Sequence, residues 1–272
     1  MTAPDIAAGL RFDHVVLGVR DLPEATAALT AAGLRQAGGG RHTGRGTANS
    51  LFALAEGYLE LLTVTDPDLA RSHSPNRAQV ADALATHPVR LLGFAFGVTD
   101  VGATGAALQA QGQHVEGPVP MTRTNPDGTV LTWRNLYVGA TQWRTLLPFL
   151  ITWDAPHDLS EAHAPRLQHV ELAAAHDAAT SPSGGLPAAR RGYQLLGATQ
   201  SAPDQLRLGA LDLSITSSEP DGDEGLTRIQ LTGGNRRSAI GAGLADVLTW
   251  TASGAGTTAA PGAATAPQTP SS

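Results

Sequence analysis

Residues 11–64 limit the fold of this chain more than any other stretch. Apolar residues alternate with smaller or polar ones over 15–19, which is typical of a strand with one buried face. Residues 22–32 are rich in Ala and Leu, with a proline near the start and a glycine just after the end, and this asymmetry predicts a helix. A glycine-rich bend is expected next, followed by two β-like runs at 50–54 and 58–64. The order predicts a βαβββ unit, which seldom stands alone.

The same pattern recurs further along the chain. Residues 90–100 align with residues 11–21 at a constant offset of 79 positions, and a helix-like segment follows at 101–111. A third echo begins at 166–172, where the spacing R-x-x-H-V-x-L of the first unit returns. The repeats predict two paired modules and a C-terminal extension. That extension is either a degenerate third module or a chance similarity in an Ala- and Leu-rich chain.

Three short motifs carry a resemblance to a known superfamily. They are Asp13-His14-Val15-Val16 on the first predicted strand, Tyr58-Leu59-Glu60-Leu61 on the last, and the stretch from Gly40 to Asn49. With them the chain resembles the vicinal oxygen chelate superfamily (glyoxalase I, extradiol dioxygenases, bleomycin-resistance proteins), and within it the glyoxalase-like, glyoxalase-3-type branch. Over residues 10–155 the resemblance implies an α+β fold in which paired βαβββ modules form one curved mixed sheet. Because one fold hosts many reactions, the chemistry has to be argued from the site.

These features divide the chain into six predicted segments. They are a flexible leader (1–9), the first module (10–66), a partly helical connector (67–89), the second module (90–155), a C-terminal extension and possible third module (156–250), and a disordered tail (251–272). No apolar run approaches the ~20 residues that a membrane span needs. No secretory signal follows Met1, so a cytoplasmic protein is expected.

The basic residues and the cysteines restrict the chemistry further. All 18 basic residues are arginine and cysteine is absent, which excludes lysine Schiff bases, disulfides, thiolate metal sites and cysteine nucleophiles. A formal net charge of -6 with scattered arginines gives no basic stripe, so nucleic acid is not an expected partner. A small-molecule ligand is expected instead. A homodimer is allowed, because members of the superfamily often pair modules across subunits.

Two residues of the first module match positions that bind a divalent metal in catalytic members of the superfamily. The resemblance assigns His14 and Glu60 as ligands, suited to Fe, Mn, Ni or Zn. The second module does not supply the other half, since its counterparts are expected to be Gly93 and Thr152. Glyoxalase I activity itself is therefore not expected.

Three interpretations of this incomplete set stay open. The third module could donate His169 and Asp212, if modules one and three face each other. His14 and Glu60 could instead be catalytic without a metal, as a general base and its orienting partner. The third interpretation is structural, with a hydrogen-bonded strand histidine and a buried acid satisfied by a nearby arginine.

The glycine-rich stretch 38–49 is the more specific candidate for substrate binding. Its glycines permit close approach of a ligand to the backbone, and its side chains place many donors within nine positions. Such donors suit a carboxylate, a phosphate or a vicinal dioxygen group. The residues expected to bind substrate are Arg41, His42, Thr47 and Asn49, whereas Arg45 is expected to be solvated.

A second candidate for substrate binding lies on a predicted strand of module two. Trp133 and Arg134 could form an aromatic wall with a cationic group beside it, although a strand tryptophan is more often part of the core. His157 and His163 are interpreted as linker residues.

Two functional hypotheses follow. The first is a small-molecule enzyme that performs a lyase, isomerase or dioxygenase-type step on an oxygenated, anionic metabolite. The second is a binding or sequestration protein of the bleomycin-resistance type, which uses the same concave sheet without chemistry.

Overall fold

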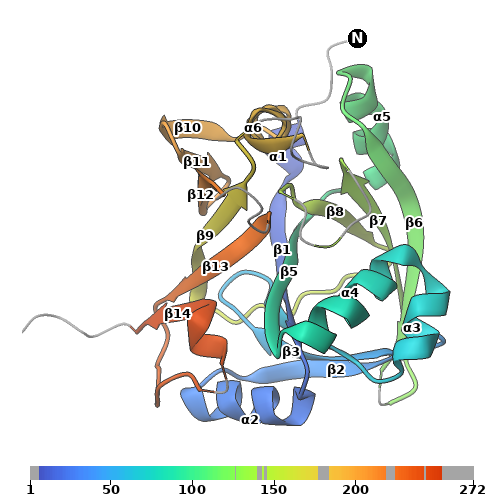
Figure 1. Cartoon of the computed structure of the whole chain (residues 1–272), viewed down its shortest axis with the longest axis vertical. Helices are drawn as coiled ribbons and strands as arrows, with labels where there is room; N and C mark the ends of the chain where they lie inside the picture. Colours follow the sequence, from blue (N-terminus) through green and yellow to red (C-terminus); the bar gives the residue numbers. More distant parts are fainter. Residues whose placement is uncertain are drawn as a thin grey trace, which may run out of the picture.

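A computed structural model gives the fold and describes residues 6–125, 127–139, 143, 146–176, 184–218, 224–241 and 243–252. The chain forms a closed barrel and, packed against it, a six-stranded sheet (Figure 1). The predicted α+β fold built from βαβββ modules is confirmed. From residue 253 onward, the predicted tail lies outside the described residues.

The first module supplies half of the barrel. Its elements are β1 (Arg11–Val19), α2 (Leu22–Ala32), β2 (Gln36–His42), β3 (Thr47–Ala53) and β4 (Tyr58–Val64). The Asp21 side chain accepts from Glu24 N at the start of α2, as an N-cap does. The glycine-rich stretch, expected to be a bend, forms strand β2 and its hairpin with β3. Gly39 has φ 145°, and a Cβ there would lie 2.5 Å from Asn49 O, so the close approach of β2 to β3 requires glycine.

The second module closes the barrel. Its elements are β5 (Val89–Gly97), α5 (Val101–Ala110), β6 (Val115–Thr124), β7 (Val130–Val138) and β8 (Phe149–Trp153). The strand order is β1-β4-β3-β2-β6-β7-β8-β5, so one seam is β1–β5 and the other is β2–β6. The second seam is weak, because Arg41 and Thr124 form its only strand pair among the described residues.

The β1–β5 register shows the repeat directly. Phe12 pairs with Phe96, and Leu17 pairs with Leu91. Leu91 lies 79 positions after Phe12, and Phe96 lies 79 positions after Leu17. This distance is the offset of the sequence repeat. The two strands are therefore related by an approximate two-fold axis.

The C-terminal extension forms a complete third module. Its elements are β9 (Arg166–Ala174), α6 (Gly185–Leu195), β10 (Thr199–Ala202), β11 (Gln205–Leu208) and β12 (Leu211–Ser217). β9 is parallel to β12, as β1 is to β4. The extra residue that bulges β1 is Asp13, and the one that bulges β9 is Gln168, 155 positions further on. Matching bulges mean that the third repeat is structural and not a chance similarity.

Part of a fourth module follows the third. β13 (Gly225–Thr232) is antiparallel to β9 and parallel to β14 (Leu248–Thr251), the relation that β5 has to β1 and β8. Between β13 and β14 the structure describes the short 3₁₀ helix η1 (Leu244–Asp246). The second sheet, β10-β11-β12-β9-β13-β14, thus corresponds to an opened barrel.

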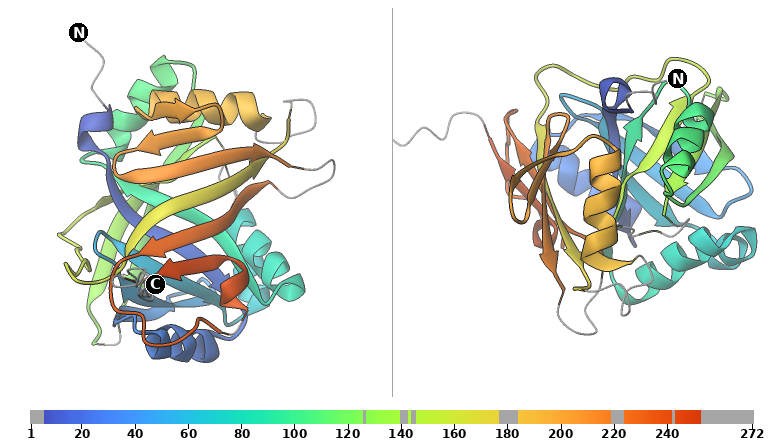
Figure 2. Two further views of the ribbon diagram at one scale, coloured as in Figure 1. Left: turned by 90° about the vertical axis from the view of Figure 1, so that its left-hand side faces the viewer. Right: turned by 90° about the horizontal axis from the view of Figure 1, so that it is seen from above.

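The second sheet and the barrel share one hydrophobic core. Val15 and Leu17 of β1 lie in the same buried cluster as Val170 and Ile229 of the second sheet. Helix α6 lies between the sheet and the barrel, with Tyr193 donating to Leu146 O at 2.7 Å (Figure 2). The opposite face of the sheet is not covered by any other described element (Figure 2).

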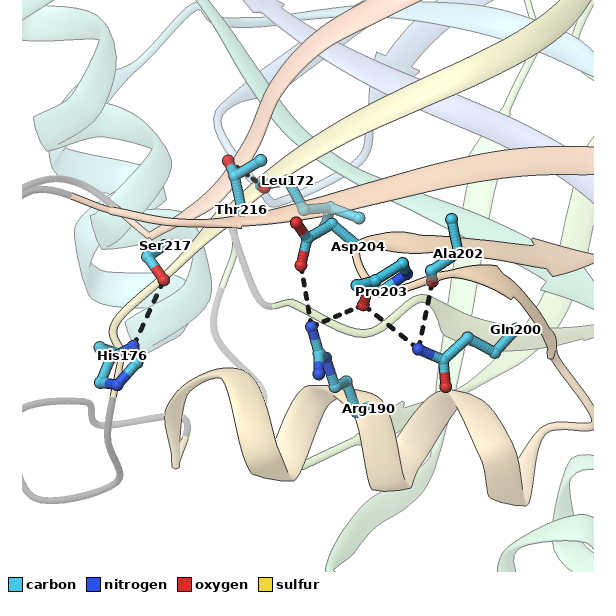
Figure 3. A network of polar contacts seen from close by, with 9 residues as sticks. All are labelled: Leu172, His176, Arg190, Gln200, Ala202, Pro203, Asp204, Thr216 and Ser217. Carbon is cyan, nitrogen blue, oxygen red and sulfur yellow. Dashed lines mark hydrogen bonds and ion pairs between the residues drawn. The ribbon is translucent and has the colours of Figure 1, made fainter.

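Polar contacts at the edge of the second sheet hold α6 in place. Arg190 donates to Asp204 Oδ1 at 2.9 Å and to the carbonyl of Pro203 at 2.7 Å (Figure 3). These contacts attach the helix to the turn between β10 and β11.

The expected flexible leader contains a short helix, α1 (Ile6–Gly9). Ile6 and Leu10 pack against the shared core, and this apolar contact gives residues 6–9 a defined position.

The connector forms two helices, α3 (Pro67–His73) and α4 (Pro75–Thr86). Val80 and Leu84 of α4 pack against inward-facing residues of β1 and β4, Val16 and Leu62. The connector therefore fills one end of the barrel and brings its own side chains to the interior.

Candidate functional site

The barrel encloses a cavity of about 410 Å³, within the size range of small-molecule sites. Alternation along the strands turns every second side chain inward. The first module and the connector contribute mostly polar and charged groups, whereas the second module contributes five aromatic rings together with Arg123 and Asn135. The cavity therefore has two chemically different walls.

His14 faces this cavity and is held by Asp13. The bulge in β1 at Asp13 lets both side chains meet, and Asp13 Oδ1 lies 2.5 Å from His14 Nδ1. Trp153 of the second module donates from Nε1 to Asp13 Oδ2 at 2.9 Å. Because a carboxylate can only accept, Nδ1 of His14 carries a proton, and in the neutral ring the lone pair is then on Nε2.

Glu60 lies beside the free nitrogen of His14. Its Oε2 is 3.7 Å from His14 Nε2, and its Oε1 accepts from Asn49 Nδ2 at 2.8 Å. Asn49 in turn accepts from Gly40 N at 3.0 Å through Oδ1, which fixes the orientation of its amide. The β-hairpin thus positions a carboxylate next to an oriented imidazole.

Gly57, in the turn between β3 and β4, supports this arrangement from behind. It has φ 63°, and a Cβ there would lie 2.1 Å from Asp13 O. The backbone that carries Asp13 is therefore in direct contact with the turn that precedes β4.

His42 is a neutral donor at the same cavity. It is 6% exposed, and its Nδ1 lies 2.9 Å from Thr47 Oγ1, which also accepts from Arg77 at 3.3 Å. The Thr47 hydroxyl proton has His42 Nδ1 as its acceptor among the described contacts, so the ring proton sits on Nε2. Burial, and then the guanidiniums of Arg77, Arg123 and Arg45, lower the pKa of His42 well below its ordinary value.

Three arginines reach the cavity from separate elements. Arg45 comes from the β2–β3 turn, Arg77 from α4 and Arg123 from β6. In the described part of the chain none of them forms an ion pair with a carboxylate, and Arg123, 4% exposed, has a buried Nε without a hydrogen-bond partner. Burial lowers the pKa of Arg77 and of Arg45. Buried guanidiniums without a carboxylate are typical of an anion site.

The wall opposite contains aromatic rings in contact with one another. Trp133 and Trp153, paired across β7 and β8, have centroids 4.9 Å apart, and Tyr137 lies 5.8 Å from Phe149. The His14 ring is stacked on Tyr58 at 4.8 Å and meets Phe149 edge-on. Flat side chains therefore surround the catalytic candidates.

Comparison with known proteins identifies the family. A family model described as a glyoxalase-like domain (Glyoxalase_3) matches residues 12–184, more than half of the chain. The chain belongs to this family. No curated protein matches the chain.

Solved structures support the same fold for this glyoxalase-like protein. A hypothetical protein from Staphylococcus aureus is similar over 89% of this chain and 99% of its own, at 15% identity and a TM-score of 0.67. Methylmalonyl-CoA epimerases from Streptomyces coelicolor and Mycobacterium tuberculosis are 20% identical over 54% and 57% of this chain, and over 99% and 94% of their own. Their TM-scores are 0.40 and 0.39, too low to carry an argument about activity.

The glyoxalase-like barrel brings most of the predicted site residues together. His14, His42, Asn49, Glu60 and Trp133 line the cavity, and Thr47 lies directly behind His42.

Two predicted substrate-binding residues point elsewhere. Arg41 precedes His42 on β2, so alternation places its side chain on the exposed outer face. Arg134 follows Trp133 on β7 and forms an ion pair with Asp154 at 3.0 Å. Arg45, expected to be solvated, lines the cavity instead.

The second-module counterparts of the metal ligands also need correction. Glu60 lies opposite Val16 in the β1–β4 register, and the equivalent residue opposite Ala95 in the β5–β8 register is Phe149. Thr152 faces away, donating to Val98 O at 2.8 Å. Gly93 remains the counterpart of His14, and a Cβ there would meet the ring of Trp143 at 3.5 Å.

The third module does not complete the set. His169 and Asp212 pair with each other on the second sheet, which is outside the barrel. His169 bonds to Ser214 at 2.9 Å, and Asp212 is paired with Arg207 at 3.1 Å. Modules one and two face each other, so the interpretation in which the third module donates His169 and Asp212 is wrong.

The barrel offers too few donor side chains to hold a divalent metal. His14 and Glu60 are close enough to share an ion, but no group of three or more His, Cys, Asp or Glu side chains in the described part of the chain is arranged to hold one. Structural and catalytic sites for such ions use three or four protein ligands. Three guanidiniums in the same cavity further oppose a cation.

Several residues of the candidate site were not predicted from the sequence. Arg77 and Asn76 come from the connector, Arg123 from a strand without a motif, and Asp13 was noted only as part of a motif. His157, interpreted as a linker residue, contacts the ring of Trp153, with the two centroids 4.0 Å apart. Burial, and then Arg123, lower the pKa of His157 to about 4.

A final observation concerns the helices. None in the described ranges is long and apolar enough to cross a membrane.

Proposed function

We propose that this glyoxalase-like protein is an enzyme that moves a proton on a small, oxygenated, anionic metabolite, as an isomerase or a lyase does. One observation carries the proposal. An imidazole oriented by a carboxylate, with a second carboxylate 3.7 Å from its free nitrogen, opens onto the same cavity as three arginines. The arginines supply the binding charge and the His14–Glu60 pair supplies the acid and base.

His14 Nε2 is the proposed general base. It takes a proton from a carbon next to a carbonyl or carboxylate group, and the electron pair of that bond moves to the carbonyl oxygen as an enolate. The guanidiniums and the His42 Nε2–H are donors for this developing charge. Asp13 and Glu60 stabilise the imidazolium that forms. Return of the proton to a different position gives an isomer, and loss of a β-substituent from the enolate gives a lyase product.

The proposed step uses no metal, because the donor set in the barrel is incomplete. A dioxygenase step, which the resemblance also allowed, needs a redox-active metal and gains no support from two ligands. A small-molecule ligand is part of the proposal. A homodimer and a cytoplasmic location stay predictions.

Exchange of substrate hydrogen with solvent tests this proposal. The protein is incubated in D₂O with a panel of 2-oxo and 2-hydroxy carboxylates, and deuterium incorporation is followed by NMR. We expect incorporation into at least one member, lost in His14→Gln and strongly reduced in Glu60→Gln. The matched control is His163→Gln, an exposed histidine. Normal exchange in His14→Gln would overturn the assignment.

A second candidate is binding without chemistry. The observation that favours it is the set of buried polar atoms that lack protein partners in the cavity wall, on Asn76, Arg123, Asn135 and Trp143. A bound ligand would satisfy them without any reaction. Saturable binding with no exchange and no turnover would support this role.

A further inference from the structure

The wall formed by the second module replaces metal ligands with aromatic rings. The two positions equivalent to His14 and Glu60 are Gly93 and Phe149. The Trp143 ring covers Gly93 at 3.5 Å from the position of a Cβ, in the space that a ligand side chain would need. The half of the site that would hold an ion is therefore built to contact a flat apolar surface.

The aromatic content of this wall is concentrated. The chain has five Phe, three Tyr and four Trp. Six of these twelve residues line the cavity: Tyr58, Trp133, Tyr137, Trp143, Phe149 and Trp153. Five of the six, all except Tyr58, pack together in one apolar cluster. Offset or edge-on ring contacts of this kind favour a planar aromatic ligand.

Charged side chains from the first module, the connector and β6 define the other end of the ligand. Arg45, Arg77 and Arg123 carry three formal positive charges, and Asp13 and Glu60 carry two negative ones. The balance of one positive charge suits a monoanion better than a dianion such as a phosphate ester. Arg45 also bonds to Met121 Sδ at 3.0 Å, and Met121 is the strand partner of Trp133, so the charged and aromatic walls are contiguous.

We propose that the ligand of this cavity is a planar aromatic monocarboxylate, with its carboxylate at Arg123 and its ring against Trp133, Phe149 and Trp153. This inference rests on the proposed function for the site and adds the substrate class. The unsatisfied Nε of Arg123 is the donor that the carboxylate completes. Oδ1 of Asn135 and Nε1 of Trp143, also without partners, are placed to bond a polar substituent of the ring.

Calorimetric titration with four small probes tests the substrate class. The probes are phenylacetate, its saturated analogue cyclohexylacetate, the uncharged 2-phenylethanol and the dianion phenyl phosphate. We expect phenylacetate to bind about tenfold more tightly than cyclohexylacetate, since ring contacts add to area burial. The other two probes should bind more weakly than phenylacetate.

Matched variants locate the two ends of the ligand. Arg123→Met should weaken phenylacetate at least about tenfold, while Arg41→Met, on the outer face of β2, should leave its affinity unchanged. Trp133→Leu should abolish the preference for phenylacetate over cyclohexylacetate. Equal affinity of these two probes for the wild type, tighter binding of phenyl phosphate, or no binding of any probe would overturn the inference.

The His14→Gln variant separates this inference from the proposed function. If the variant and the wild type both bind phenylacetate with the aromatic preference, and neither exchanges substrate hydrogen, the ligand class stands and the catalytic proposal fails. If hydrogen exchange depends on His14 but only non-aromatic acids are substrates, the catalytic proposal stands and the ligand class fails.

Discussion

Asn49 on β3 donates to Glu60 on β4 at 2.8 Å, and this bond fixes the carboxylate beside His14. Asn49→Leu should reduce kcat at least about tenfold, because Glu60 loses its orienting partner. It should also lower the free energy of unfolding by about 1–3 kcal/mol, since Gly40 N and Glu60 Oε1 lose their bonds inside the barrel. Steady-state kinetics and urea unfolding measure both effects. Ser50→Ala, which removes a contact to Thr26 outside the cavity, is the control and should change stability but not kcat.

The Asp13–His14 contact predicts a second kinetic effect. Asp13→Asn keeps the size of the side chain and can still accept from Trp153, but its amide no longer holds the proton of His14 on Nδ1. We expect kcat to fall by about 10²- to 10⁴-fold with KM changed little. The structure predicts no such loss for Asp154→Asn, which breaks an ion pair on the outer face of β7. Wild-type kinetics in Asp13→Asn would contradict the role of His14 as base.

Metal dependence provides a third prediction. Because the barrel offers two ligands and three arginines, exhaustive treatment with a chelator should leave activity and the melting temperature unchanged. Elemental analysis should find no stoichiometric divalent ion that the wild type binds and the His14→Gln variant loses. If one equivalent of a divalent ion restored activity to chelator-treated protein, the prediction would be wrong.

Stability should depend on pH through two histidines. Folding lowers the pKa of His42 well below its ordinary value of 6.5, and that of His157 to about 4. In mildly acid solution the unfolded chain therefore binds more protons than the folded one, so stability falls as the pH drops below about 6.5. For His157 the loss is complete near pH 4. Urea unfolding between pH 7.5 and pH 5 should show a smaller decrease for His42→Gln/His157→Gln than for the wild type, and an equal decrease would contradict the prediction.

The sequence predicted the modules well because their signal is repeated. The offsets of 79 and 155 positions reappear as strand register and as matching bulges in β1 and β9. His14 and Glu60 were assigned from the family resemblance, and the structure places them on the neighbouring strands β1 and β4.

The sequence could not place the arginines. β2 is too rich in glycine to show an apolar alternation, so nothing in it indicates that His42 faces inward and Arg41 outward. Arg77 enters the cavity only because α4 fills one end of the barrel, a packing relation between distant segments. The prediction that Thr152 is the counterpart of Glu60 is wrong, because the sequence does not show the length of β8. The strand register identifies Phe149 as the counterpart.

The barrel and the second sheet share one core, which includes Val15, Leu17, Val170 and Ile229. The two parts therefore cannot be separated without exposing apolar surface. The barrel holds the whole cavity, yet its outer wall at β1 is apolar and is covered by the second sheet. A chain that stopped after Trp153 would keep every residue that lines the cavity and expose that wall to water. We expect such a fragment to aggregate. The described residues after Trp153 line no part of this cavity, yet they are what shields the barrel that contains it.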